Sequence, residues 1–112
     1  MNSQNVLKAI ADESRMKIIE LLLQHNYCVR ALSRRLKITE AAISQHLKVL
    51  REAGLLTGER KGYYVHYHVN RDVLKRLSSE IFKLSEIEET ACAPGHGGCE
   101  PAEQKNCRVK NE

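Results

Sequence analysis

The sequence predicts a mainly α-helical domain with one small β-hairpin, in the order α-α-α-α-β-β-α. Two observations support this fold class. Before residue 55, apolar residues recur every three or four positions, which is the spacing of helices that are buried on one face. From residue 55 to residue 69 the period changes to two, as in a β-strand, and it returns to the helical period after residue 70.

The first two helices are short, and a capping residue separates them. Val6, Leu7 and Ile10 form an apolar stripe that ends before Asp12, and aspartate is a favoured residue at the N-cap of a helix. A second helix comes next, and the polar pair His25–Asn26 ends it. The residues that we expect to face inward on this helix are Met16, Ile19, Leu22 and Leu23.

The third and fourth helices are joined by a tight turn, which predicts a helix-turn-helix. We expect the third helix from about Cys28 to Leu36, and a fourth helix that is capped by Thr39 and ended by Gly54. Lys37 lies in the turn, where glycine is common; a left-handed backbone there costs on the order of 1 kcal/mol. The expected inward residues are Val29, Leu32 and Leu36, then Ile43, Leu47 and Leu50.

The segment after the fourth helix predicts a hairpin with a basic tip. Gly58 and Gly62 bracket Glu59, Arg60 and Lys61, and we expect these three residues at the tip. In the second strand, we expect one face to carry Val65, Tyr67 and Val69 and the other to carry Tyr64, His66 and His68.

A last helix is expected from about Arg71 to Thr90. Its apolar stripe is narrow and heptad-like, and a domain of this size has little left to cover it, so we expect a partner helix. Packing of the stripe on the domain's own core is the alternative. The stripe consists of Leu74, Leu77, Ile81 and Leu84.

The composition changes after residue 90. Both prolines, three of the six glycines and three of the four cysteines fall within residues 91–112. The sequence therefore predicts a folded domain over 1–90 and a flexible Cys/Gly-rich tail over 91–112.

Charge and composition narrow the classes of function. Residues 28–69 carry eight basic and three acidic groups, and the rest of the chain has an excess of one acidic group, so a basic surface for nucleic-acid phosphates is expected on this one module. An aromatic content of 4% disfavours stacking platforms for single strands or RNA. No segment resembles a signal peptide or a membrane span, which predicts a cytoplasmic protein without membrane contact.

The order of elements and three motifs resemble the ArsR/SmtB family of winged helix-turn-helix repressors. The motifs are ADESR at 11–15, SQHLKVLREAGLL at 44–56 and KGYYVHY at 61–67, and the resemblance covers about 5–90. It implies a homodimer that is joined through the first and last helices, binds a palindromic double-stranded DNA operator and is released by an inducer.

The fourth helix is then the recognition helix. Gln45 is suited to a bidentate contact with adenine, and Ser44 and His46 to contacts with bases or phosphate. The other expected DNA-binding residues neutralise phosphates; they are Lys48, Arg51, Arg60 and Lys61. The alternative for each residue is an ordinary solvated surface position.

The cysteines are the candidate sensor. Residues 71–90 contain no histidine for the family's zinc-type site, and Arg30 replaces the second cysteine of the Cys-x-Cys pair that its arsenic sensors often carry. The candidate metal ligands are therefore Cys28, Cys92, Cys99 and Cys107, with His96 nearby. Thiolates favour soft ions, so the expected inducer is As(III), or Cd(II), Pb(II), Hg(II) or Zn(II), with no organic cofactor.

Two other interpretations use the same thiols. One is a redox or reactive-sulfur switch through a disulfide or polysulfide. The other is a protein that sequesters metal without binding DNA specifically. An enzyme is not expected, because the chain has no Cys-x-x-Cys and no strand-helix setting for one.

Overall fold

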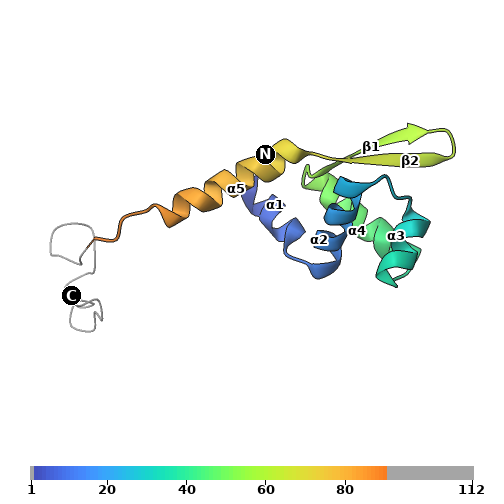
Figure 1. Cartoon of the computed structure of the whole chain (residues 1–112), viewed down its shortest axis with the longest axis horizontal. Helices are drawn as coiled ribbons and strands as arrows, with labels where there is room; N and C mark the ends of the chain where they lie inside the picture. Colours follow the sequence, from blue (N-terminus) through green and yellow to red (C-terminus); the bar gives the residue numbers. More distant parts are fainter. Residues whose placement is uncertain (1, 91–112) are drawn as a thin grey trace. The chain divides into compact units, whose positions relative to one another are not determined.

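The computed structural model describes residues 2–90, and it is a mainly helical winged helix-turn-helix with a β-hairpin, as the sequence predicts (Figure 1). The helices before the hairpin are α1 (Ser3–Ile10), α2 (Glu13–Gln24), α3 (Val29–Leu36) and α4 (Glu40–Glu52). The hairpin consists of β1 (Leu56–Lys61) and β2 (Tyr64–Val69), and α5 (Arg71–Ser85) comes after it. The chain divides into two units after Phe82, and residues 2–82 belong to the first. The predicted tail over 91–112 lies outside the described residues, and the predicted boundary after residue 90 stays a prediction.

Side-chain caps start α2 and α4, and both were predicted. The Arg15 backbone N–H donates to Asp12 Oδ1 over 2.9 Å, and the Ala42 N–H donates to Thr39 Oγ1 over 3.1 Å. The cap from the Arg15 N–H is the main reason why the pKa of Asp12 is lowered; burial opposes it, and the nearby Arg15 guanidinium reinforces it. These local bonds fix where both helices begin.

The turn between α3 and α4 is held in a left-handed conformation. Lys37 has φ 58° and ψ 41°, which confirms that a lysine occupies a backbone position that favours glycine. The Ser33 hydroxyl donates to the Ile38 carbonyl, and the Ile38 N–H donates to the Ser33 carbonyl over 3.3 Å. After α4, Gly54 with φ 84° ends the helix, also as predicted.

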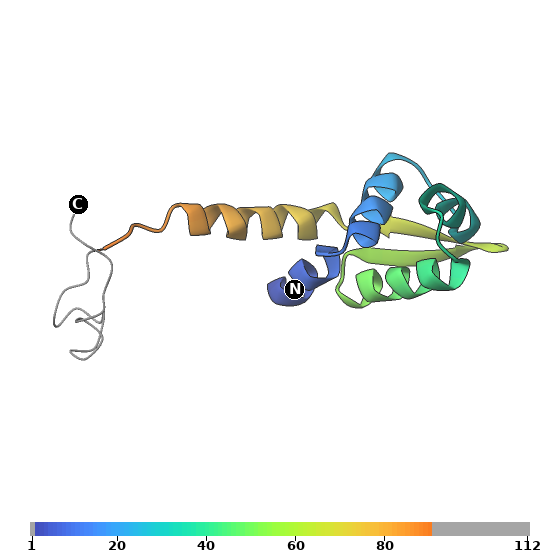
Figure 2. The ribbon, with the colours of Figure 1, turned by 90° about the horizontal axis from the view of Figure 1, so that it is seen from below.

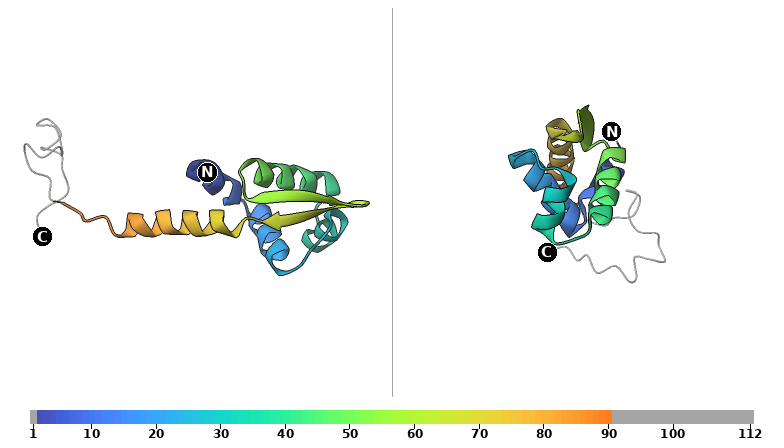
Figure 3. Two further views of the ribbon diagram at one scale, coloured as in Figure 1. Left: turned by 90° about the horizontal axis from the view of Figure 1, so that it is seen from above. Right: turned by 90° about the vertical axis from the view of Figure 1, so that its right-hand side faces the viewer.

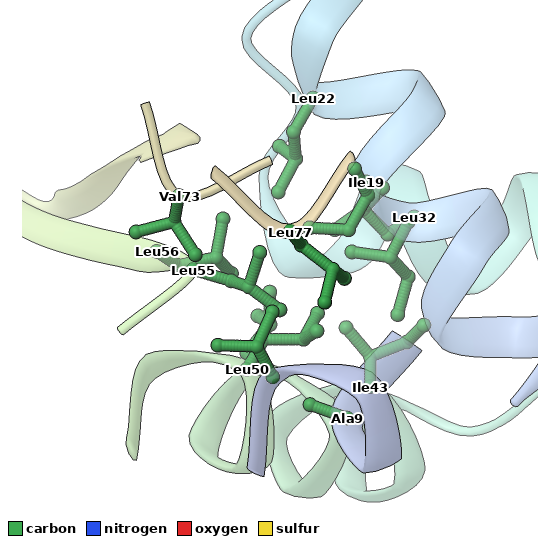
Figure 4. Close-up of a cluster of buried hydrophobic side chains, with 13 residues drawn as sticks. Ala9, Ile19, Leu22, Leu32, Ile43, Leu50, Leu55, Leu56, Val73 and Leu77 are labelled. Atoms are coloured by element: carbon green, nitrogen blue, oxygen red, sulfur yellow. The ribbon is translucent and has the colours of Figure 1, made fainter. Parts of the chain in front are cut away.

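One apolar core joins these elements (Figure 4). Its buried side chains within the described residues are Val6, Ala9, Ile18, Ile19, Leu22, Leu32, Ile43, Leu47, Leu50, Leu55, Leu56, Val73 and Leu77. The prediction was wrong for Met16, which is 40% exposed, because Ile18 takes the inward position. At about 100° per residue, Met16 lies roughly 110° from the centre of the face that residues 18, 19 and 22 share. Leu7 is likewise 47% exposed.

The hairpin corrects the predicted tip. The two strands pair from Leu56–Val69 as far as Lys61–Tyr64, so only Gly62 and Tyr63 remain for the turn. Gly62 has φ 65°, as the first central residue of a type II′ turn requires. Glu59, Arg60 and Lys61 therefore lie in β1 and not at the tip. The predicted faces of β2 hold in part: Tyr64 and His68 are exposed, whereas His66 is half-buried with Val65, Tyr67 and Val69.

The last helix is shorter than predicted, since α5 ends at Ser85 and not near Thr90. Glu86, Glu88 and Glu89 come next, and negative charge is unfavourable at the C-terminal end of a helix. Of its apolar stripe, Leu77 is buried and Leu74 packs against the core, whereas Ile81 is 49% and Leu84 66% exposed. Among residues 2–90, no helix is long and apolar enough to span a membrane.

Replacing Lys37 by glycine should stabilise the protein. The left-handed backbone costs a lysine on the order of 1 kcal/mol, and glycine removes that cost while adding some entropy to the unfolded chain. We expect a gain in unfolding free energy of up to about 1 kcal/mol in urea denaturation. Lys37→Ala is the matched control, because it removes the charge and keeps the strain. An equal gain for both variants would assign the effect to charge and contradict the prediction.

Replacing Asp12 by alanine should destabilise the protein by about 1 kcal/mol at pH 7, because the α2 cap is lost. The pKa of Asp12 is lowered from 3.8 in the folded protein, so its ionised form contributes fully above that pH and the contribution is lost as the pH falls below it. Urea denaturation of both proteins at pH 7 and pH 3 measures this difference. Asp12→Asn keeps an oxygen for the cap and cannot ionise; the stability difference between the Asn and Ala variants should not narrow at pH 3.

Candidate nucleic-acid-binding surface

The outer face of α4 is polar and exposed. Its inner face is fixed by three side chains, because Ile43, Leu47 and Leu50 are at most 1% exposed. A helix that is held on one side in this way presents its opposite side to solvent. Four of the predicted DNA-binding residues lie exposed on α4: Ser44, Gln45, Lys48 and Arg51. The width of a B-DNA major groove, about 12 Å, admits such a helix.

His46 is placed differently from its neighbours. It is half-buried, and its Nδ1 lies 3.4 Å from Nη1 of Arg15 on α2. One ring nitrogen is therefore already engaged within the protein. Base or phosphate contact by His46 stays a prediction, with only the other nitrogen available for it.

The hairpin lies alongside α4 and carries the remaining predicted residues (Figures 2 and 3). Arg60 and Lys61 are exposed, but as neighbours in β1 they project to opposite faces of the hairpin. Lys61 Nζ is 3.7 Å from Glu59 Oε1, and an exposed pair of this kind contributes only about 0–1 kcal/mol. Lys61 can therefore exchange Glu59 for a phosphate at little cost. Tyr63, at the tip, is fully exposed.

The sequence interpretation assigned no DNA-binding role to the arginines of α3. Arg30, Arg34 and Arg35 are exposed on this eight-residue helix, and the Arg35 guanidinium lies 4.4 Å from the centre of the Tyr27 ring. Their positive charge was counted in the basic excess of residues 28–69, which was the available signal, but none was assigned a role. The first helix of the helix-turn-helix therefore carries exposed positive charge, as α4 and the hairpin do.

Of the predicted metal ligands, only Cys28 can be placed. It is exposed, occupies the N-cap of α3 without a side-chain capping bond, and lines an open groove of about 1060 Å³. Tyr27, Arg34 and Tyr64 also line this groove. Within residues 2–90, no three His, Cys, Asp or Glu side chains are grouped so that they could hold a metal ion. Cys92, Cys99 and Cys107 lie outside the described residues.

Comparison with protein families identifies the central part of the chain. Residues 12–57 match the family described as bacterial regulatory protein, arsR family. This segment runs from the cap of α2 to the start of β1 and so includes the whole helix-turn-helix.

Three curated proteins resemble most of the domain. The chain is 35% identical over 71 residues to the transcriptional repressor SdpR of Bacillus subtilis, which covers 63% of this chain and 79% of SdpR. It is 38% identical over 74 residues to the arsenical resistance operon repressor of the same organism, covering 65% and 70%. It is 34% identical over 79 residues to the transcriptional activator HlyU of Vibrio cholerae, covering 70% and 73%. Similar proteins thus include both repressors and an activator.

Solved structures give the same fold. The homodimeric winged helix-turn-helix DNA-binding domain Mb0332 of Mycobacterium bovis is 26% identical, with a TM-score of 0.60 over 77% of this chain and 81% of that one. Reduced HlyU of Vibrio cholerae is 33% identical, with a TM-score of 0.58 over 71% and 84%.

Proposed function

We propose that this chain is a transcriptional repressor; it belongs to the arsR family of bacterial regulatory proteins and is therefore a DNA-binding transcriptional regulator and not an enzyme. In this proposal it binds a palindromic operator as a homodimer. It leaves the operator when a thiophilic metal or metalloid binds its cysteines. The observation that carries this proposal is the exposed polar face of α4, fixed by a buried inner face and flanked by a basic hairpin. The relatives SdpR and the arsenical resistance operon repressor support repression over activation. Because a repressor must be in the same compartment as the DNA that it binds, a cytoplasmic location is part of the proposal.

The proposed contacts with the operator are of two kinds, those to bases and those to phosphates. Gln45, exposed in the N-terminal half of α4, reads adenine, and Ser44 and His46 contact neighbouring bases or phosphate. The phosphates on either side are neutralised by Lys48, Arg51, Arg60 and Lys61. Base contacts set the preferred sequence, and phosphate contacts set the general affinity.

The homodimer is supported by exposed apolar side chains on the outer helices. Leu7 on α1 and Ile81 and Leu84 on α5 are each between 47% and 66% exposed in one protomer. A second copy would remove them from water, and Mb0332, a similar protein, is homodimeric. Two recognition helices in a two-fold dimer read half-sites one helical turn apart, about 34 Å.

The proposed inducer is As(III), or Cd(II), Pb(II), Hg(II) or Zn(II). Cys28 fits a soft ion because its thiol is exposed. Cys92, Cys99 and Cys107 would supply the further thiolates, within one subunit or from the other. An ion bound there would form a strong bond to the sulfur of Cys28, which is the residue immediately before α3.

A redox or reactive-sulfur switch is the second candidate, because the same exposed thiol suits it and a similar protein, HlyU, has been solved in a form described as reduced. Sequestration of metal without specific DNA binding is the third. Both candidates retain the fold. The redox switch differs from the first candidate in the species that reacts with the cysteines, and sequestration differs in that no operator is released.

Substitutions at Gln45 and Arg60 should separate sequence preference from affinity. Gln45→Ala should weaken binding to the operator by about 5- to 150-fold and bring it closer to the affinity for a scrambled duplex. Arg60→Ala should weaken binding to every duplex by a similar factor and lower the slope of log K against log salt by about 1. Lys17→Ala on α2 is the control for loss of one exposed positive charge. A wild-type protein that binds scrambled duplex as tightly as operator would refute specific DNA binding.

A titration with thiophilic ions should identify the inducer and its ligands. On operator DNA, As(III), Cd(II), Pb(II), Hg(II) and Zn(II) are compared with an oxidant in metal-free buffer, and the inducing ion should lower affinity by about 5- to 150-fold. The response should disappear in Cys28→Ser and in a chain that ends at Ala91.

Three outcomes of that titration would contradict the proposal in different ways. If the chain that ends at Ala91 responds like the full chain, the tail cysteines are not ligands. A response to the oxidant alone would favour the redox switch. Metal binding without any specific operator binding would favour sequestration.

A further inference from the structure

Arg15 links three elements of the fold through one side chain. Residue 15 lies on the same face of α2 as Ile18, Ile19 and Leu22, and its side chain is only 18% exposed. Its Nε–H donates to the Ala9 carbonyl, and its Nη2 donates to the Lys8 carbonyl over 3.4 Å. Both carbonyls belong to the last turn of α1, where backbone acceptors lack partners within the helix itself, and the Lys8 carbonyl also accepts from the Ala11 N–H over 3.3 Å.

The same guanidinium reaches the recognition helix. Arg15 Nη1 is 3.9 Å from Asp12 Oδ2, the carboxylate that caps α2, and 3.4 Å from His46 Nδ1 on α4. Asp12 and His46 thus both approach the same guanidinium nitrogen, Nη1. The contact between Arg15 and His46 joins residues that lie 31 positions apart in the sequence.

The chemistry of the two groups decides where the His46 proton lies. A guanidinium is always charged and has five N–H donors and no acceptor, so the nitrogen that faces it must accept. Nδ1 is then unprotonated and the single ring proton is on Nε2. We propose that Arg15 is a positioning residue for DNA recognition, which fixes His46 in its neutral Nε2–H form and so decides what His46 reads.

This inference rests on the proposed function, because it assigns a partner to a residue of the recognition helix. With Nδ1 engaged, His46 offers one N–H donor from the far side of its ring. That donor pairs with an acceptor: a guanine N7 or O6, a thymine O4 or a phosphate oxygen. It does not pair with the amino groups of adenine or cytosine, which need an acceptor. The opposite proton placement would reverse this selection.

The first test observes the proton in the full-length protein without DNA. Long-range ¹⁵N–¹H NMR of protein labelled at histidine distinguishes the two neutral forms of His46, with His46→Gln used to assign its signals. We expect the Nε2–H form alone in the wild type and a mixture of both forms in Arg15→Lys, which keeps the charge and loses the fork. Lys17→Gln, on the same helix with its own partner Glu13, should leave the His46 signals unchanged. An Nδ1–H form of His46 in the wild type would overturn the inference, whatever the Arg15 variant shows.

The second test reads the consequence on operator DNA. A glutamine amide can place a donor where Nε2 was, whereas an asparagine amide reaches only the position of Nδ1. His46→Gln should therefore keep the operator affinity within about threefold, and His46→Asn and His46→Ala should lose about 5- to 150-fold. Arg15→Lys should weaken operator binding when it is the only substitution. It should have no further effect when His46 is already replaced by alanine.

The outcomes separate this inference from the proposed function. Additive effects of Arg15→Lys and His46→Ala would assign Arg15 a purely structural role and overturn the inference. Circular dichroism melting of each variant shows whether it is folded, and the wild-type NMR result needs a variant only to assign the His46 signals. A wild type that binds no specific operator would refute the proposed function, while the NMR result would still decide the Arg15–His46 contact.

Discussion

The burial of one face of α4 is the constraint on which the rest of the structure depends. Ile43, Leu47 and Leu50 lie in the core and fix both the rotation of the helix and its distance from α2 and β1. Full burial of one such side chain stabilises a fold by about 1.5–3 kcal/mol, so three of them outweigh any single polar contact on the outer face. The residues on the outer face can therefore suit a binding partner without affecting the core, and the packing of the core does not constrain Gln45 and Lys48.

Elements whose signals are local could be predicted from the sequence. Asp12 and Thr39 each bond an amide three residues further on, and Gly54 ends α4 by its own backbone conformation, so a short window of sequence contains all the information. The errors came where a distant neighbour decides. Met16 and Ile18 both fit a helical stripe, and only the elements packed on α2 select between them. The hairpin tip depended on how far β1 and β2 continue to pair.

The candidate surface shows the same division. Exposed residues of α4 could be predicted because the inner stripe fixes the outer face. The contact of Arg15 with His46 could not, since it joins positions 31 residues apart and neither residue type is unusual at its place. The contact of the Arg35 guanidinium with the Tyr27 ring was missed too, although these two residues are close in sequence. Pairing through space leaves no periodic signal in the sequence.

Two routes lead into the recognition helix, and they begin at different elements. From α1, the carbonyls of Lys8 and Ala9 are held by Arg15, so a shift of the last turn of α1 moves the group that meets His46. From α3, Cys28 stands at an N-cap that no side chain satisfies, and Leu32 in the same helix is fully buried against the core that holds α4. A soft ion bound to Cys28 would add strong bonds at the N-terminal end of α3, and no side-chain cap would be broken there. The proposed inducer thus acts at the start of α3, where its binding breaks no side-chain cap. Its effect on DNA binding is then transmitted through the packing of α3 on α4.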